Sequence, residues 1–110
     1  MESKLLYSAT NHLKSKLLWK EINNEEWIYF GTDAHIDSDL IQKSINEYFN
    51  GEAIFFVYER TNSGHLEEEQ YQKMFHAILG NKNFFLWNKK LTKAIEFSYI
   101  GILRFGELDN

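Results

Sequence analysis

The sequence predicts a single α/β domain over residues 1–110, in which helices pack on a three- or four-stranded, largely parallel sheet. Helix and strand patterns alternate along the chain, which is typical of right-handed βαβ units. Two runs, residues 53–58 and 83–87, are apolar almost throughout, as strands covered on both faces are. The expected order is α-β-α-β-α-β-(α)-β, with the order of the strands in the sheet left open.

Helices are predicted where apolar residues recur every three or four positions between a capping residue and a glycine or turn. They cover about residues 8–22, the segment from Asp37 or Ser38 to Gly51, residues 66–79 and, as a short fourth helix, residues 88–95. Strands are predicted where short runs are rich in aromatic and β-branched residues. They cover residues 27–30, 53–58, 83–87 and 98–108.

The composition excludes several classes of protein. Hydrophobic residues make up 44% of the chain and aromatic residues 16%, enough for a packed core and far from a disordered composition. The chain has no cysteine, which excludes disulfide frameworks and thiolate metal sites. Neither a secretory signal nor an apolar run of membrane-spanning length is recognisable. We therefore expect a cytoplasmic protein that does not associate with membranes.

The charge is strongly polarised along the chain. Residues 25–69 carry eleven carboxylates against Lys43 and Arg60, a net charge of −9, whereas the whole chain has a net charge of −4. Such a field repels nucleic acid and attracts basic partners. The aromatic residues lie among these acids rather than among basic residues, so a base-stacking surface is not expected. The sequence thus predicts no binding of nucleic acid.

Carboxylates near the end of the first predicted strand could hold a divalent cation together with His35. These are Asp33, Asp37 and Asp39. Their position before and within the first turn of a helix already accounts for two of them, since Asp37 can cap that helix and Asp39 suits its dipole. No spacing here matches a known metal motif. We therefore predict no metal and no cofactor.

Catalysis is also not expected. The four histidines are spread over separate elements, and no serine or cysteine nucleophile is spaced around any of them. A pair such as His35 and His65 could still converge at one end of the sheet. Every glycine is isolated, so the chain has no glycine-rich phosphate loop. The prediction is that the protein is not an enzyme.

The chain resembles the small, acidic, cytoplasmic immunity proteins of bacterial contact-dependent growth-inhibition systems. The resemblance lies in the size, the absence of cysteine, the acidic middle, the aromatic-rich α/β pattern and three C-terminal stretches, Phe84-Phe85-Leu86-Trp87-Asn88, Ala94-Ile95-Glu96-Phe97 and Gly101-Ile102-Leu103-Arg104. It implies a tight, stoichiometric inhibitor of a protein toxin. In such systems the toxin is often a nuclease with a basic active site.

The expected function is therefore to bind a cognate toxin domain and to cover its basic active site with carboxylates. Tyrosines within the acidic segment could add contact area, because tyrosine is favoured at binding hot spots. The predicted contact residues are Asp33, Asp37, Asp39, Glu47, Tyr48, Glu59, Glu67, Glu68 and Glu69. Three alternatives stay open: a phage-type inhibitor of a nucleic-acid-binding defence complex, a small enzyme using His35 or His65, and a structural subunit of a larger assembly.

Overall fold

The computed structural model describes residues 2–32, 35–79 and 81–108, which form one sheet and three helices. The helices are α1 (Ser3–Leu13), α2 (Ser38–Phe49) and α3 (Tyr71–Ile78), and two 3-10 turns are present at η1 (Lys14–Lys16) and η3 (Glu68–Gln70). The strands are β1 (Leu17–Trp19), β2 (Ile28–Tyr29), β3 (Ile54–Val57), β4 (Gly64–Leu66), β5 (Phe84–Asn88), β6 (Lys93–Ser98) and β7 (Ile102–Leu108).

The prediction of a largely parallel sheet is wrong, because every strand pair of the described residues is antiparallel. The strand order is β1-β7-β6-β5-β3-β4, and β2 pairs with the other end of β7. The physical reason lies in the connections. Residues 58–63, 89–92 and 99–101 join neighbouring strands directly, and such short links allow hairpins, whereas a parallel crossover needs a dozen or more residues.

The short helix predicted over residues 88–95 is replaced by the turn between β5 and β6. Asn88 is buried, and its Oδ1 accepts hydrogen bonds from the backbone N–H groups of Thr92 (2.8 Å) and Lys93 (3.0 Å). Its Nδ2 donates to Thr92 Oγ1 at 2.8 Å. An asparagine that bonds the backbone a few residues ahead favours a turn over a helix. The side chain predicted to cap a helix therefore closes a hairpin instead.

The first predicted helix also ends early. α1 stops at Leu13, and Leu17 to Trp19 pair with Leu108, Glu107 and Gly106 of β7 instead of continuing a helix. Pairing with β7 satisfies the backbone groups of a strand that would otherwise be a free edge. The third predicted helix is shortened as well, because Leu66 belongs to β4 and η3 precedes α3. By contrast, the helix after Asp37 and the apolar strands β3 and β5 are confirmed.

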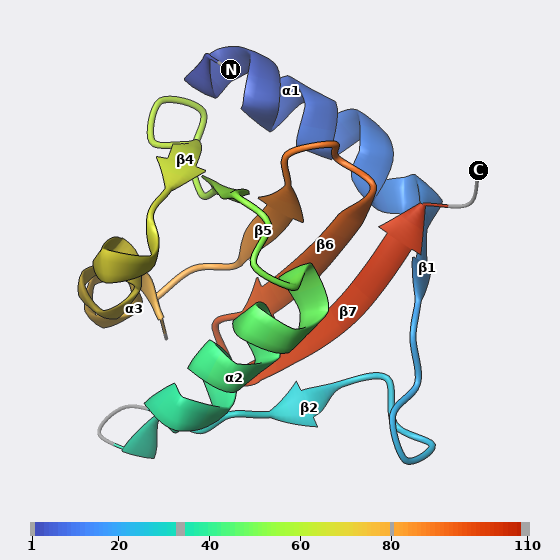
Figure 1. The fold of residues 1–110 in the computed structure, drawn as a ribbon, viewed down its shortest axis with the longest axis vertical. Helices are drawn as coiled ribbons and strands as arrows, with labels where there is room; N and C mark the ends of the chain where they lie inside the picture. The colour runs from blue at the N-terminus through green and yellow to red at the C-terminus, as the bar shows by residue number, and fades with distance from the viewer. Residues whose placement is uncertain (1, 33–34, 80, 109–110) are drawn as a thin grey trace.

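The sheet lies between α1 on one face and α2 with α3 on the other. On the α2 face, Ile41, Ile45 and Phe49 pack with α3 and with alternate residues of β5, β6 and β7. On the opposite face, Leu6 of α1 packs against Phe55, Val57 and Trp87. Figure 1 shows α2 in front of the sheet and α1 at the top of the view. The two-sided burial expected for β3 and β5 is thus confirmed, although the sheet is antiparallel.

Gly101, in the turn between β6 and β7, permits a close approach of two backbone segments. Its φ is +97°, and a Cβ added there would lie 2.4 Å from the carbonyl oxygen of Gly31. At the same junction the Phe30 N–H donates to the Gly101 carbonyl at 2.8 Å. This contact joins the segment after β2 to the sheet.

We expect Gly101→Ala to lower the free energy of unfolding by about 1–3 kcal/mol, because alanine brings both strain at positive φ and a steric clash. Urea denaturation measures the change. Gly64→Ala is the matched control, since a Cβ at Gly64 meets nothing within 4 Å. Equal midpoints for the two variants would contradict the close approach at Gly101.

Candidate functional site

The predicted contact residues on α2 lie at its start. Asp37 is the N-cap of the helix, and its side chain accepts a hydrogen bond from the Leu40 N–H at 3.0 Å. Asp39 follows in the first turn and is exposed. Asp33 lies outside the described residues. Asp37 therefore has a structural role that accounts for it, while the Asp39 carboxylate is available to a partner.

Glu59 lies apart from these residues, in the turn between β3 and β4. Its Oε1 is 2.7 Å from Lys82 Nζ. This hydrogen bond and ion pair lower the pKa of the Glu59 carboxyl and raise the pKa of Lys82. Because its charge is already offset by a lysine, Glu59 contributes less to an acidic surface than its place in the sequence indicated.

Glu67 and Glu68 line a polar groove between the C-terminal end of α2 and η3. The groove has a volume of about 260 Å³, and Glu52 contributes a third carboxylate to it. Ile45, Phe49 and Leu66 form its apolar part. The described residues that line it include no lysine or arginine. We call this cavity the acidic groove.

Two hydrogen-bonded contacts shape one side of the acidic groove. His65 Nε2 lies 2.6 Å from Glu67 Oε1. Glu67 and Gln70 form a capping box, in which the Gln70 side chain accepts from the Glu67 N–H at 2.9 Å. Glu67 is thus held in place by His65 of β4 and by Gln70 of η3. Neither element was predicted, because a single helix was expected over residues 66–79.

Tyr71 lines the same groove and is 6% exposed. Burial raises the pKa of its hydroxyl, and the nearby carboxylates of Glu68 and then Glu67 raise this pKa further. The groove therefore holds a neutral hydroxyl beside two carboxylates. Other lining residues make side-chain hydrogen bonds as well: Glu52 Oε2 accepts from Asn88 Nδ2 at 3.5 Å, and Asn46 Oδ1 accepts from Gln42 Nε2 at 3.2 Å.

Glu47 and Tyr48 lie on the other side of α2, where they line a second groove. This groove has a volume of about 360 Å³ and is mostly apolar, with Ile22, Ile28 and Phe105 among its lining residues. We call it the apolar groove. The Tyr48 hydroxyl donates to the Gly106 carbonyl at 2.6 Å. Burial and then the Glu107 carboxylate raise the pKa of this hydroxyl. Tyr48 thus anchors α2 to β7, and its hydroxyl is already bonded within the protein.

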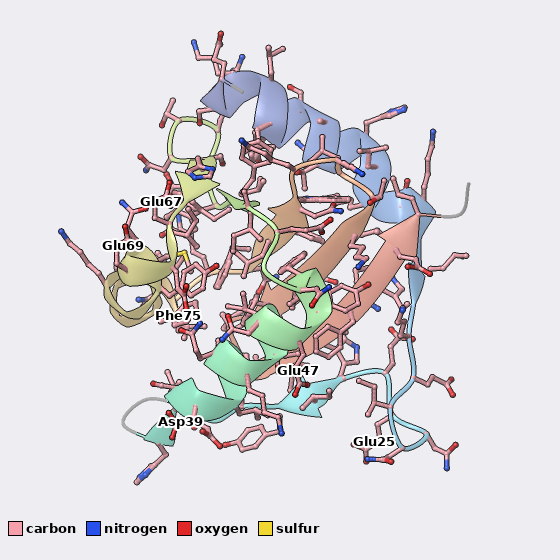
Figure 2. All side chains as sticks on the ribbon, viewed as in Figure 1. Glu25, Asp39, Glu47, Glu67, Glu69 and Phe75 are labelled. Carbon is pink, nitrogen blue, oxygen red and sulfur yellow. The ribbon has the colours of Figure 1, made fainter. Side chains whose placement is uncertain are left out.

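The ion pairs of the described residues divide the carboxylates into two groups. Glu26, Glu47, Glu59, Glu67, Glu96 and Glu107 each lie within 4.0 Å of a basic or histidine nitrogen. No such partner among the described residues lies near Asp39, Glu52, Glu68 or Glu69. Figure 2 shows Glu69 beside Glu67 near α3, and Glu25 well apart from both. These four carboxylates belong to α2, to the segment after it and to η3. Elsewhere in the described residues, Glu2, Glu21, Glu25 and Asp37 also make no ion pair.

Arg104 forms a cluster that the sequence did not indicate. Its Cζ lies 3.6 Å from the centre of the Trp19 ring and 4.3 Å from that of Trp27. The Nε donates to Glu96 Oε1 at 2.8 Å, and Nη1 donates to Glu26 Oε1. Only the register of β1, β6 and β7 brings these residues together. The cluster holds the loop between β1 and β2 against β7, and that loop forms one wall of the apolar groove.

Three further results bear on function. Within residues 2–32, 35–79 and 81–108, no group of three or more histidine, aspartate or glutamate side chains is placed to hold a metal ion. None of the described helices has the length and apolar character needed to cross a membrane. Comparison of the chain with protein-family models, with curated proteins and with solved structures gave no significant match.

Proposed function

We propose that this protein is a stoichiometric inhibitor of the immunity-protein type, which binds a basic toxin domain and covers its active site. The observation that supports this proposal best is the acidic groove. Three carboxylates from two separate segments, Glu52 with Glu67 and Glu68, line it without any lysine or arginine among the described lining residues. A surface of this kind complements a basic one.

The proposed target is a nuclease, since a nuclease binds phosphate through lysine and arginine. An inhibitor that presents carboxylates in place of phosphates can block such a site. Opposite fields also speed the encounter of the two proteins. The exposed carboxylates Asp39 and Glu69, which make no ion pair with the described residues, lie outside the groove and extend the acidic surface. An inhibitor of a nucleic-acid-binding defence complex would need the same surface, and a toxin gene beside this one would favour the immunity role.

One observation favours a second candidate function. His65 and Glu67 form a histidine–carboxylate pair at 2.6 Å, and both line the acidic groove. A carboxylate that orients an imidazole is a common arrangement for a general base. The described lining residues include no serine, threonine or cysteine that this base could activate. We therefore place a His65-dependent hydrolase second to the inhibitor.

The inhibitor proposal predicts that charge reversal on the α2 and η3 side weakens binding. The variant Asp39→Lys, Glu68→Lys, Glu69→Lys is tested against the purified product of the neighbouring gene. Its association rate should fall about tenfold or more at low salt, because steering is electrostatic. The loss should shrink at higher salt, where charges are screened over roughly 8–10 Å. Stopped-flow association kinetics at two salt concentrations measure both effects.

The matched control is Glu2→Lys, Glu21→Lys, Glu25→Lys, which changes the net charge equally at exposed positions elsewhere. It should slow association only a few-fold, since it alters the net charge but not the proposed face. If reversal of Lys89 and Lys90 in the β5–β6 turn abolished binding instead, the assignment of this face would be wrong. If His65→Ala abolished protection of toxin-producing cells while binding persisted, the enzyme would become the better explanation.

A further inference from the structure

We propose that a pocket between α1 and the sheet binds a small aromatic carboxylate that carries a hydroxyl group at the opposite end of its ring. The pocket has a volume of about 200 Å³, and α1, β3 and β5 all contribute lining residues. Three of these residues, Tyr7, Val57 and Phe85, belong to the cluster on the α1 face of the sheet. The inference therefore concerns a different site from the acidic groove and does not rest on the proposed inhibitor function.

Thr10 is the residue that points to a ligand. It lines the pocket and is 3% exposed, and its Oγ1 has no hydrogen-bond partner among the described residues. A threonine hydroxyl within a helix ordinarily bonds a backbone carbonyl one turn earlier, but this one does not. A buried polar atom without a partner is costly, so native proteins seldom keep one. A hydroxyl group of a bound ligand would supply the missing hydrogen bond, because the threonine hydroxyl both donates and accepts.

The side of α1 that lines the pocket is polar along its length. The lining residues from α1 and the turn after it follow the i, i+3, i+4, i+7 spacing of one helix face: Tyr7, Thr10, Asn11 and Lys14. A helix face that packs on a sheet is normally an apolar stripe. Here the neighbouring Leu6 is fully buried in the core. α1 thus packs on the sheet through one stripe and lines the pocket with groups that can bind a ligand through the next.

The size and the walls of the pocket suit one aromatic ring. A protein cavity of about 150 Å³ is enough to hold benzene, and this pocket is somewhat larger. Tyr7, Tyr58 and Phe85 line it and are only partly buried. Their rings therefore keep apolar surface that a ligand can cover, and aromatic rings pair favourably in offset-stacked or edge-to-face arrangements. The body of the ligand is thus expected to be a single aromatic ring.

Lys14 gives the pocket its preference for an anion. This lysine is exposed and makes no ion pair with the described residues. Glu96 also lines the pocket, but its charge is offset, because its Oε1 accepts from Arg104 Nε at 2.8 Å. The helical rise separates positions 10 and 14 by about 6 Å along the axis, close to the length of a benzene ring with substituents at opposite ends. One ligand can therefore place a hydroxyl group at Thr10 and a carboxylate at Lys14.

The test is a titration of the ¹⁵N-labelled protein with 4-hydroxybenzoate, followed by NMR. Saturable shifts are expected around the pocket, among them those of Tyr7, Asn11 and Phe85, and not around the acidic groove. Three related probes each lack one feature of 4-hydroxybenzoate. Benzoate lacks the hydroxyl group, 4-methylphenol lacks the carboxylate, and trans-4-hydroxycyclohexanecarboxylate lacks the aromatic ring. Each should have a dissociation constant about threefold or more above that of 4-hydroxybenzoate.

Two variants assign the ends of the ligand. Thr10→Val keeps the shape of the side chain and removes its hydroxyl, so 4-hydroxybenzoate should bind about fivefold more weakly while the affinity for benzoate is unchanged. Lys14→Gln should weaken the binding of both carboxylates about threefold. Its matched control is Lys16→Gln, which removes the same charge from an exposed residue that does not line the pocket. This control should leave both dissociation constants within about 1.5-fold of those of the unchanged protein.

A stability measurement distinguishes a hydroxyl that serves a ligand from one that serves the fold. Because Thr10 Oγ1 has no partner in the free protein, Thr10→Val should leave the midpoint of thermal unfolding unchanged or raise it. A midpoint lowered by about 4 °C or more would mean that the hydroxyl stabilises the protein itself, and it would overturn the inference. Shifts that do not saturate, equal affinities for benzoate and 4-hydroxybenzoate, or equal losses in the Lys14 and Lys16 variants would each overturn it as well.

Discussion

Replacing Phe97 by alanine is expected to lower the free energy of unfolding by about 3–5 kcal/mol, as large aromatic truncations in a packed core do. Phe97 is fully buried on the face of the sheet that α2 and α3 cover. Its ring stacks on that of Phe84 with 4.5 Å between their centroids, and the Phe30 ring approaches at 5.8 Å. The truncation removes these contacts and leaves a cavity between the sheet and the helices that cover it. The free energy of unfolding of a small domain is about 5–15 kcal/mol, so this loss is a large fraction of the total.

Guanidinium denaturation followed by circular dichroism measures this effect. Tyr99→Ala is the control, because Tyr99 is an aromatic residue of the neighbouring turn and is 56% exposed. Its stability should change by about 0.5 kcal/mol or less. Phe97→Leu should fall between the two, since leucine fills part of the space. A midpoint for Phe97→Ala that matched the Tyr99→Ala midpoint would contradict the burial of this ring.

Replacing Arg104 by methionine is expected to lower the free energy of unfolding by about 2–4 kcal/mol. This is somewhat less than the effect of removing one partner from a fully buried ion pair. The Arg104 side chain is 19% exposed, and its removal takes away the ion-pair partner that Glu96 and Glu26 share. Methionine keeps much of the apolar length, so the change isolates the charge and the cation–π contacts with Trp19 and Trp27. Tryptophan emission and thermal unfolding measure the loss.

A double variant distinguishes unpaired carboxylates from lost packing. In Arg104→Met with Glu96→Gln, one of the two carboxylates left without an ion-pair partner is made neutral, so part of the stability should return. Arg60→Met is the control, because Arg60 is exposed and makes no ion pair with the described residues. Its stability should stay within about 0.5 kcal/mol of that of the unchanged protein. If Arg104→Met behaved like Arg60→Met, the cluster would not hold the loop between β1 and β2.

The two grooves give α2 a central place in the proposed binding face. The acidic groove lies on one side of the helix and the apolar groove on the other. Binding energy in protein interfaces is concentrated in a few desolvated residues, surrounded by contacts that exclude water. Under the proposed function, we expect the carboxylates of the acidic groove to be among these residues. Asp39 and Glu69, which lie outside the acidic groove, are expected to contribute mainly to the rate of encounter.

The elements predicted correctly are those whose own residues decide the structure. α2 has a capping aspartate, an apolar stripe at helical spacing and a left-handed Asn50 after its end, all of which are local features. β3 and β5 consist of apolar residues that alternate between two covered faces. No distant contact was needed to recognise them, because capping and patterning act over one or two turns or strands.

The elements predicted wrongly depend on distant partners. Leu17 to Trp19 continue an apolar pattern at helical spacing, yet they pair with β7, about ninety residues further along the chain. Residues 88–95 were predicted as a short helix, but the buried Asn88 side chain accepts hydrogen bonds from the backbone of the turn between β5 and β6. Weak helix propensity was outweighed in both places by pairing within a sheet. The wrong prediction of parallel strands followed from these two errors. In one, a helix was predicted in place of the edge strand β1, and in the other a helix was predicted in place of the hairpin between β5 and β6.

For the binding site, the sequence by itself determined the amount of charge and its segment: residues 25–69 with a net charge of −9. The tertiary structure decided which of these charges remain free. It paired Glu59 with Lys82 and Glu26 with Arg104, and it placed Glu52 beside Glu67 and Glu68 around Tyr71. The physical reason is that net charge is a sum over residues, whereas an ion pair or a groove depends on distances between segments. Those distances are set by the packing of the sheet against its helices.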